Sequence, residues 1–359
     1  LSIPLLRDSV LGEYAELSGS YRRFDYSQAG TGDVYGVNLV YRPVHDFTIK
    51  TSYNTSFRVP NLAETSGPLV QTFANSFVDP CDTRQITSSA RTAEERANRI
   101  ANCTALAAAK GLTYNWTDVT AANAYLPTYS SGIAGVNGGN PLLRPETSTS
   151  FTFSTVFQPR GLPGFSALLD YYEIAIDDVI QSVTAQQLAN QCVNGPSLDT
   201  FACDRIFRDG SSTGDPYDAF KVDRPLGHPI GGFIQVPVNY ARREVSGLDF
   251  KARYTFDTAD VIGRDLGRLT FDLGGSWLIA QKNFTSFTDP SFYTELAGTP
   301  YYPRVRFTNR ITWAPTDNLS VTWTTDWQTA QNITRYRDFI ASGNFDSRPV
   351  SSLNTGNFA

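Results

Sequence analysis

The side chains that could carry out chemistry are few, and they do not form a catalytic set. Only two histidines occur, His45 and His228, and neither lies in a metal-binding or triad-like context. Asp177 and Asp178 could form a carboxylate pair for acid–base catalysis, but consecutive strand residues point to opposite faces of a sheet. The glycine-rich stretch at 135–140 precedes a predicted strand rather than a helix, which argues against a phosphate site. We therefore expect a protein that is not an enzyme and holds neither a cofactor nor a metal centre.

Cysteine is more informative, because the four cysteines fall as two local pairs. Cys81 with Cys103, and Cys192 with Cys203, each lie inside a polar and irregular segment. Local pairs in loops are typical of disulfides that form outside the cytoplasm. Four free thiols are the alternative, whereas a zinc site is disfavoured because neither histidine lies near a cysteine. The sequence predicts two disulfides.

The same polar segments are rich in aromatic and amide side chains, which suit recognition of a ligand. Rings beside amides can bind sugars, flat chelates and peptides alike. The alternative is that most of these rings pack the segments against one another. The candidate ligand contacts are Arg58, at the end of a predicted strand, and Tyr114, Trp116, Tyr125, Tyr129 and Phe233.

Composition narrows the class of protein. Of the 359 residues, 41% are hydrophobic and 18% are charged, and the formal net charge is −5. An acidic chain without basic runs is not expected to bind nucleic acid. No long run of apolar residues occurs, so we expect no transmembrane helix. The opening LSIPLLRDSV resembles the end of a strand and the closing LNTGNFA holds no strand signal, so we expect a piece of a larger polypeptide.

Alternation of apolar and polar residues dominates the sequence and predicts long β-strands. Leu248, Phe250 and Tyr254 share one face of such a strand, for example, and Asp249 and Lys251 share the other. Nine strands, or ten, begin near residues 13, 33, 47, 149, 165, 243, 268, 303 and 319. Alternation alone leaves two folds open, because a soluble sandwich buries its apolar face and a membrane barrel turns that face to lipid.

Three features favour the barrel. The strands run about 9–12 residues, which matches a tilted strand that crosses a bilayer. Short turns alternate with connections as long as 61–148 and 181–242, as expected for periplasmic turns and extracellular loops. Aromatic residues gather near strand ends, where interfacial girdles form. The sequence predicts an all-β fold, a transmembrane antiparallel β-barrel with long extracellular loops that contain short helices.

Charged residues on the polar faces of the strands indicate a wide barrel. They are Lys50, Asp170, Lys251, Arg253, Asp272, Arg304, Arg306, Arg310 and Asp326. Burying these charges without partners is costly, so the lumen must be hydrated or filled by a polar partner. An open sheet of nine strands would also leave unpaired edges in lipid, so further strands are expected in the parent chain.

Two helices are predicted inside the long connections. Residues 92–111 are rich in alanine and end at Lys110 and Gly111, which suits a helix stop. A second helix begins at Thr184, with Gln187 three residues later in the spacing of a capping box.

Two strand-end motifs carry a resemblance to a known family. SFRVPNLAE at 56–64 resembles the F-R-A-P-x-L-x-E motif of TonB-dependent outer-membrane receptors, with Val59 in place of the usual alanine. NPLLRPETS at 140–148 resembles the partner motif N-P-x-L-x-P-E-x-S, and 168–181 resembles the strand that follows it. Pro60 ends strand pairing at the outer rim, and Arg58 is expected to donate to carbonyls freed there. A direct ligand contact by Arg58 is the alternative.

The resemblance implies a barrel of about 22 strands around a plug domain. The chain, 1–359, would be a C-terminal-half segment that lacks the plug and the terminal strands. The family resides in the outer membrane of Gram-negative bacteria, among lipid and lipopolysaccharide, and couples to TonB–ExbB–ExbD through an N-terminal region absent from this chain. The expected extracellular ligand is a scarce nutrient such as a ferric siderophore, a cobalamin or an oligosaccharide. A passive porin, and a secreted all-β enzyme or adhesin, are the alternatives.

Overall fold

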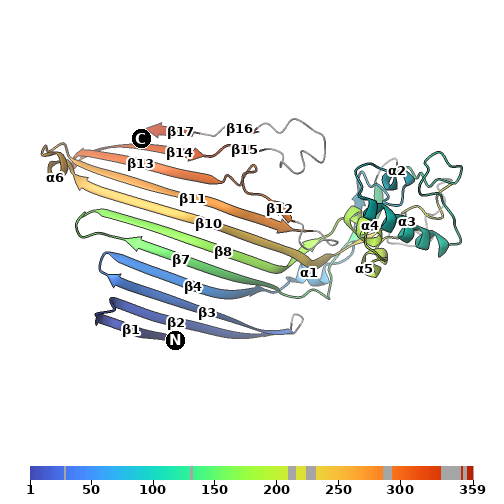
Figure 1. Cartoon of the computed structure of the whole chain (residues 1–359), viewed down its shortest axis with the longest axis horizontal. Helices are drawn as coiled ribbons and strands as arrows, with labels where there is room; N and C mark the ends of the chain where they lie inside the picture. Colours follow the sequence, from blue (N-terminus) through green and yellow to red (C-terminus); the bar gives the residue numbers. More distant parts are fainter. Residues whose placement is uncertain are drawn as a thin grey trace.

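One long antiparallel sheet, here called the wall, dominates the fold (Figure 1). The computed structural model describes residues 1–27, 30–129, 132–208, 216–223, 232–285, 293–332, 349–350 and 354–358. Within these ranges, eleven strands pair with their neighbours in chain order, and β12 (Tyr293–Glu295) pairs beside β11. The eleven are β1 (Ser2–Ser9), β2 (Gly12–Tyr26), β3 (Gly30–Val44), β4 (Phe47–Arg58), β7 (Glu146–Phe157), β8 (Phe165–Ser182), β10 (Pro237–Asp257), β11 (Arg268–Phe284), β13 (Val305–Thr316), β14 (Leu319–Gln328) and β17 (Asn354–Phe358). A separate two-stranded sheet joins β15 (Gln331–Asn332) to β16 (Pro349–Val350).

The predicted number of strands, nine or ten, is too low, because the wall also contains β1 and β17. The expectation that LNTGNFA holds no strand is wrong, since Asn354–Phe358 pairs with β14. These residues are mostly polar and include a glycine, so they show no apolar alternation. Their pairing comes from the neighbouring strand, which no local pattern reveals.

The register of the wall separates an apolar face from a polar one, as the alternation predicts. Leu248 of β10 pairs with Trp277 of β11, and Tyr254 pairs with Phe271. Between them, on the other face, Arg253 pairs with Asp272, and their side chains approach to 3.6 Å. Apolar residues therefore pair with apolar residues on one face, and residues of opposite charge pair on the other.

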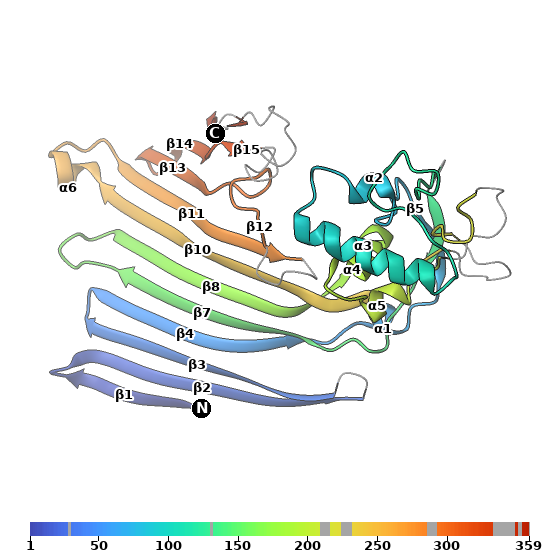
Figure 2. The ribbon, with the colours of Figure 1, turned by 45° about the vertical axis from the view of Figure 1, so that its right-hand side comes forward.

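The apolar face of the wall is exposed rather than packed against a second layer. Phe153, Leu169 and Trp277 keep 40%, 47% and 48% of their surface exposed. The hydrophobic core of the described residues lies instead among the long connections at one end of the sheet (Figure 2). An apolar strand face with no protein layer over it is the pattern of a wall that contacts lipid.

The longest connections leave from one end of the wall, and the opposite end carries only short turns. Short turns join β3 to β4, β7 to β8 and β13 to β14, and α6 (Thr258–Ile262) lies in the turn between β10 and β11 at the same end (Figure 1). The connections at 59–145 and 183–236 leave from the other end. The predicted alternation is confirmed. None of the described helices is both long enough and apolar enough to cross a membrane.

Placing one charge on each face of the wall tests this assignment. Leu273 lies on the apolar face of β11, paired with Ala252 and Asn309, whereas Thr308 of β13 lies on the polar face beside Asp326. We expect Leu273→Arg to lower the free energy of unfolding in lipid vesicles by about 2–4 kcal/mol, the effect of arginine at the lipid-facing mid-plane. Denaturant titrations should show a smaller loss for Thr308→Arg. Equal losses in the two variants would contradict the assignment of faces.

Candidate functional site

The two longest connections fold together into one unit, here called the loop module (described residues of 67–139 and 183–236; Figure 2). The first connection contributes β5 (Val70–Ala74), α2 (Thr83–Ile86), α3 (Ala93–Ala108) and β6 (Ile133–Asn137). The second contributes α4 (Ala185–Asn194), α5 (Thr200–Cys203) and β9 (Ile234–Gln235). Strand β6 pairs antiparallel with β5 and parallel with β9, so a single small sheet joins the two connections.

The two predicted helices are confirmed as α3 and α4. Each begins with a capping box, in which the N-cap threonine and the third helical residue exchange side-chain and backbone hydrogen bonds. The N-caps are Thr92 for α3 and Thr184 for α4. Beyond the end of α3, Gly111 has a φ of +71°, a backbone conformation that favours glycine at a helix stop.

Both predicted disulfides are confirmed, and each lies within one connection. Cys81 bonds to Cys103, 22 residues later, and links the start of α2 to α3. Cys192 bonds to Cys203 and links α4 to α5. A cross-link that closes a loop of about 20 residues removes chain entropy from the unfolded state worth roughly 3 kcal/mol. Each disulfide therefore adds a covalent link within one connection beside the hydrophobic core that the two connections share.

The aromatic candidates for ligand contact lie in the interior of the loop module. Tyr125 and Phe233 have no exposed surface, and Trp116 keeps 5%. Tyr114 and Tyr129 are partly buried and pack against the same core. The ring centroid of Tyr125 lies 5.1 Å from that of Tyr114 and 6.0 Å from that of Trp116. These rings hold the two connections together, as the packing alternative predicts, and a contact between them and a ligand stays a prediction.

A buried ion pair joins the two connections beside this aromatic core. Arg208 donates from Nη2 to Asp79 Oδ1 at 2.6 Å and from Nη1 to Asp79 Oδ2 at 2.7 Å. The Tyr125 hydroxyl donates to Asp79 Oδ2 at 2.8 Å, and the Arg208 guanidinium lies 4.8 Å from the Phe220 ring centroid. Both charged side chains are almost fully buried. The carboxylate is thus compensated by a partner that is far away in the sequence.

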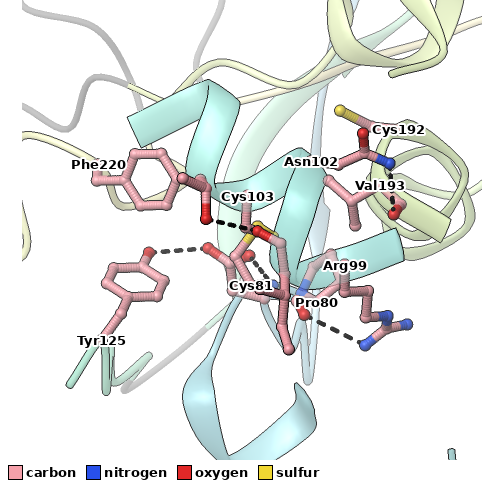
Figure 3. The surroundings of a disulfide bond; sticks show 12 residues. Pro80, Cys81, Arg99, Asn102, Cys103, Tyr125, Cys192, Val193 and Phe220 are labelled. Atoms are coloured by element: carbon pink, nitrogen blue, oxygen red, sulfur yellow. Dashed lines mark hydrogen bonds between the residues drawn. A yellow bond between two sulfur atoms is a disulfide. The ribbon is translucent and has the colours of Figure 1, made fainter. Parts of the chain in front are cut away.

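A second polar contact docks α3 on the end of α4 (Figure 3). Arg99, which is fully buried, donates to Asn194 Oδ1 at 2.7 Å and to the Pro80 carbonyl at 3.2 Å. Asn102 donates from Nδ2 to the carbonyls of Val193 and Gly195. These carbonyls have no partner within the last turn of α4, so Asn102 satisfies them. Burial, together with the charge of Arg91, lowers the pKa of Arg99 to about 10.

The two sequence motifs meet where the first connection leaves and rejoins the wall, here called the rim junction (Arg58, Glu64, Asn140, Glu146 and Asn239). Arg58 at the end of β4 donates two hydrogen bonds, of 2.7 and 2.8 Å, to the carboxylate of Glu146 of β7. It also bonds Glu64 of α1 (Leu62–Ser66) at 3.0 Å. The expectation that Arg58 donates to freed carbonyls is wrong, because the strand register and the capping box of α1 bring two carboxylates to it. Charge-assisted bonds of this kind are the stronger ones.

Two asparagines extend the rim junction to β8 and β10. Asn140 donates from Nδ2 to the Pro237 carbonyl at 2.9 Å. Asn239 accepts from the Arg144 backbone N–H at 2.8 Å and donates to the carbonyls of Arg144 and Asp178. The outer ends of β4, β7, β8 and β10 are therefore tied to the same short segment. Sequence reasoning did not predict these contacts of Asn239, because they join residues 95 and 61 positions apart in the chain.

The carboxylates that could have formed a catalytic pair have separate partners. Asp178 bonds Arg144 at 2.9 Å, and Asp177 lies 3.3 Å from Arg242. In the part of the chain that the structure describes, no group of histidine, cysteine and carboxylate side chains could hold a metal ion.

The polar face of the wall carries a concave site of about 620 Å³. Its polar lining comes from Asp249, Ser276, Arg306, Thr308, Asp326 and Gln328. Arg306 donates to Ser276 at 3.1 Å, so strands β11 and β13 share their polar contacts on this face. Such a surface suits water or a polar partner, as the charge pattern predicts.

A comparison with protein families identifies the class. Residues 12–358 match the model of the TonB dependent receptor-like, beta-barrel family. Since the match spans nearly all of the chain, the protein belongs to this family, whose members are outer-membrane transporters of Gram-negative bacteria rather than enzymes. The wall is part of such a barrel. The predicted family, fold class and location are confirmed.

Solved structures of two receptors resemble the chain. One is the siderophore receptor PirA from Acinetobacter baumannii, with a TM-score of 0.51 and 14% identity over 96% of this chain and 39% of PirA. The other is a mutant of the ferric enterobactin receptor PfeA from Pseudomonas aeruginosa in complex with enterobactin, with a TM-score of 0.50 and 14% identity over 96% of this chain and 35% of PfeA. This likeness shows the fold. The chain spans less than two-fifths of either receptor, and no curated protein matches it.

Breaking the Asp79–Arg208 ion pair tests whether it holds the two connections of the loop module together. Arg208→Met leaves Asp79 charged and unpaired in the interior, so we expect it to destabilise the module by about 3–5 kcal/mol. The control is Arg144→Met, because Arg144 pairs with Asp178 at 2.9 Å while both side chains stay exposed, at 69% and 39%; we expect at most about 1 kcal/mol there. Limited proteolysis of the loops measures both. If the two variants were cut at the same rate, the ion pair would not hold the connections together.

The buried tyrosine makes the module sensitive to alkali. Burial, and then the charge of Asp79, raises the pKa of Tyr125 well above its ordinary value. Unfolded tyrosine ionises near pH 10 while folded Tyr125 stays protonated, so its contribution is complete below about pH 10 and declines as the pH rises above it. We expect the loss of loop protection between about pH 9 and 11 to be shallower for Tyr125→Phe. If loop protection in Tyr125→Phe fell as steeply with pH as in the wild type, the ionisation of Tyr125 would not cause the loss.

Proposed function

We propose that the protein serves the TonB-coupled uptake of a scarce nutrient, with the loop module as the region that captures the ligand outside the cell. Family membership supports a transport role. The placement of the module at the end of the wall opposite the short turns supports an extracellular position, since long loops of outer-membrane barrels lie outside. Loops of this size also favour a receptor over a passive porin.

A ferric siderophore is the substrate class that we place first. PirA is a siderophore receptor, and a PfeA mutant was solved in complex with enterobactin. A cobalamin and an oligosaccharide are the alternatives, and an uptake assay separates the three.

The observation that carries the proposal is that the two connections form one preorganised unit. The Asp79–Arg208 pair and the contacts of Arg99 and Asn102 join them across 91 to 129 positions of sequence. The rim junction then fixes this unit to four strands. A binding region that is already ordered loses less entropy when it captures a ligand, so affinity is retained without a large interface.

The two edge strands of the wall indicate that further strands complete the barrel. Within the described residues, β1 and β17 each have one neighbour in the sheet. Because an unpaired strand edge is not stable in lipid, we infer that further strands close the barrel, to about 22 in all, and that a plug fills its polar lumen. On this proposal, TonB–ExbB–ExbD contacts a region N-terminal to the chain, and outer-membrane lipid and lipopolysaccharide surround the wall.

Uptake by the full-length protein tests the function. Cells that carry the intact gene should accumulate one labelled nutrient from a panel of ferric siderophores, cobalamin and oligosaccharides, and should lose this uptake when TonB is deleted. Uptake that persists without TonB would instead indicate a porin.

A rim variant tests the role of the loops. Arg58→Met leaves Glu64 and Glu146 without their shared partner, so the base of the loop module loosens. We expect ligand affinity to fall about tenfold, equivalent to about 1.4 kcal/mol. Arg160→Met removes an arginine that pairs with Asp46 at 2.9 Å in the short turns, and should leave affinity unchanged. Titration with the transported ligand measures the affinity of each variant. If Arg58→Met and Arg160→Met bind the ligand equally well, the loop module does not capture the ligand, even where the uptake assay has established transport.

A further inference from the structure

The loop module contains a strand with an open edge. In the three-stranded sheet β5–β6–β9, β5 is the outer strand, and its described neighbour is β6 alone. An open edge presents backbone N–H and C=O groups that can pair with another chain. Which groups these are follows from the register.

The hydrogen bonds of β6 divide its residues between two neighbours. Val136 donates its N–H to the Phe233 carbonyl, and Gly138 donates to the Gln235 carbonyl. Even-numbered residues of β6 therefore face β9, and odd-numbered residues face β5. Gly135, which is odd-numbered, pairs with Thr72.

The same alternation assigns the two edges of β5. Val70, Thr72 and Ala74 pair with the odd-numbered residues of β6, so their backbone groups point inward to the sheet. The backbone N–H and C=O groups of Gln71 and Phe73 point to the open edge. No hydrogen bond to these groups occurs among the described residues. Two donors and two acceptors thus stand in the spacing of a β-ladder.

Nothing along this strand protects the edge. Leu69 and Val70 each keep 55% of their surface exposed, and Phe73 keeps 58%. No charged residue occurs between Glu64 and Asp79. Natural sheets usually shield an edge with a charged side chain, a proline or a bulge within the strand. This edge is uncharged, apolar and accessible.

We propose that β5 binds an extended, uncharged peptide by strand addition, as a ligand distinct from the transported nutrient. Only an extended backbone matches donors and acceptors in this alternating spacing. An uncharged peptide fits best because β5 carries no charged side chain that could pair with a charge on the added strand. On the face of Val70 and Thr72, side chains of the added strand would lie beside a cavity of about 480 Å³ lined also by Asn137, Gln235 and Pro237.

A free peptide fits this edge better than a second copy of the protein does. A peptide can approach the edge from solvent in either direction. A second copy is held in the same membrane by its own barrel, which restricts the orientation of its β5. Self-pairing is therefore an outcome that the experiment must separate from peptide binding.

The experiment measures binding of a peptide to the full-length receptor in detergent. The probe is an end-capped, dye-labelled peptide of ~8 residues that alternates threonine and valine, the length of an ordinary strand. We expect saturable binding by fluorescence anisotropy. A peptide N-methylated at every residue, which has no backbone donor on either edge for the Gln71 and Phe73 carbonyls, should bind at least about tenfold more weakly.

A pair of variants tests the edge itself. Phe73→Pro removes an outward-pointing donor and leaves the inner ladder through Thr72 and Ala74 intact. We expect it to weaken peptide binding about tenfold, whereas Phe73→Thr, which keeps the donor, should bind as the wild type does. Amide exchange at Thr72 and Ala74 shows whether β5 still pairs with β6. If Phe73→Pro disrupts that pairing, Gln71→Pro provides the same test.

Several results would overturn the proposal. They are an absence of saturable binding, equal binding of the N-methylated peptide, and unchanged affinity in the proline variant whose inner ladder is intact. Dimers that form through β5 and exclude the peptide would assign the edge to self-pairing. None of these results depends on which nutrient the receptor transports.

Discussion

A backbone in lipid must pair all of its hydrogen-bonding groups, and the architecture of this protein follows from that constraint. The wall satisfies it through an antiparallel ladder whose neighbours follow the order of the chain. All irregular backbone is thereby displaced to the two ends. One end keeps only short turns, and the other carries two connections long enough to fold as a unit in water.

That unit is held together by polar groups as much as by its aromatic core. Asp79 and Arg208 are buried, but each compensates the charge of the other, and Tyr125 supplies a further hydrogen bond to the carboxylate. At the rim, Arg58 plays a comparable part between Glu64 and Glu146, with its side chain half exposed. Arginine suits both places because its planar guanidinium can bind two carboxylate oxygens at once. The rim contacts fix the module to the wall, and the buried ion pair joins its two connections.

The features predictable from the sequence were those with a local signature. Alternation revealed the two faces of β10 and β11, the capping-box spacing located α4, and the short spacing of the cysteines indicated the disulfides. The features that could not be predicted from the sequence depend on contacts between residues that are far apart in the chain. Asp79 and Arg208 lie 129 residues apart and neither belongs to a motif, and β17 acquires its pairing from β14.

The two strand-end motifs were recognisable in the sequence, but the bonds that their residues form were not. They contain Arg58, Glu64 and Glu146, but the sequence predicted bonds from Arg58 to freed carbonyls, and its bonds to the glutamates follow only when the register places Glu146 opposite Arg58. The aromatic candidates show the same limit. Composition identified Tyr125 and Phe233 as notable, yet a ring that binds a ligand and a ring that fills a core look alike in a sequence; burial distinguishes them.

The central claim is that lipid covers the apolar face of the wall, and the tryptophans offer the most direct test. Trp277, Trp313, Trp323 and Trp327 alternate with the polar-face residues of their strands, whereas Trp116 lies in the core of the loop module. Fluorescence of the full-length protein should be quenched by bromine-labelled phospholipids through the four wall tryptophans, and a variant that retains only Trp116 should resist this quenching. If the wall tryptophans were insensitive to labelled lipid and were quenched instead by iodide in the aqueous phase, the apolar face would not contact the bilayer.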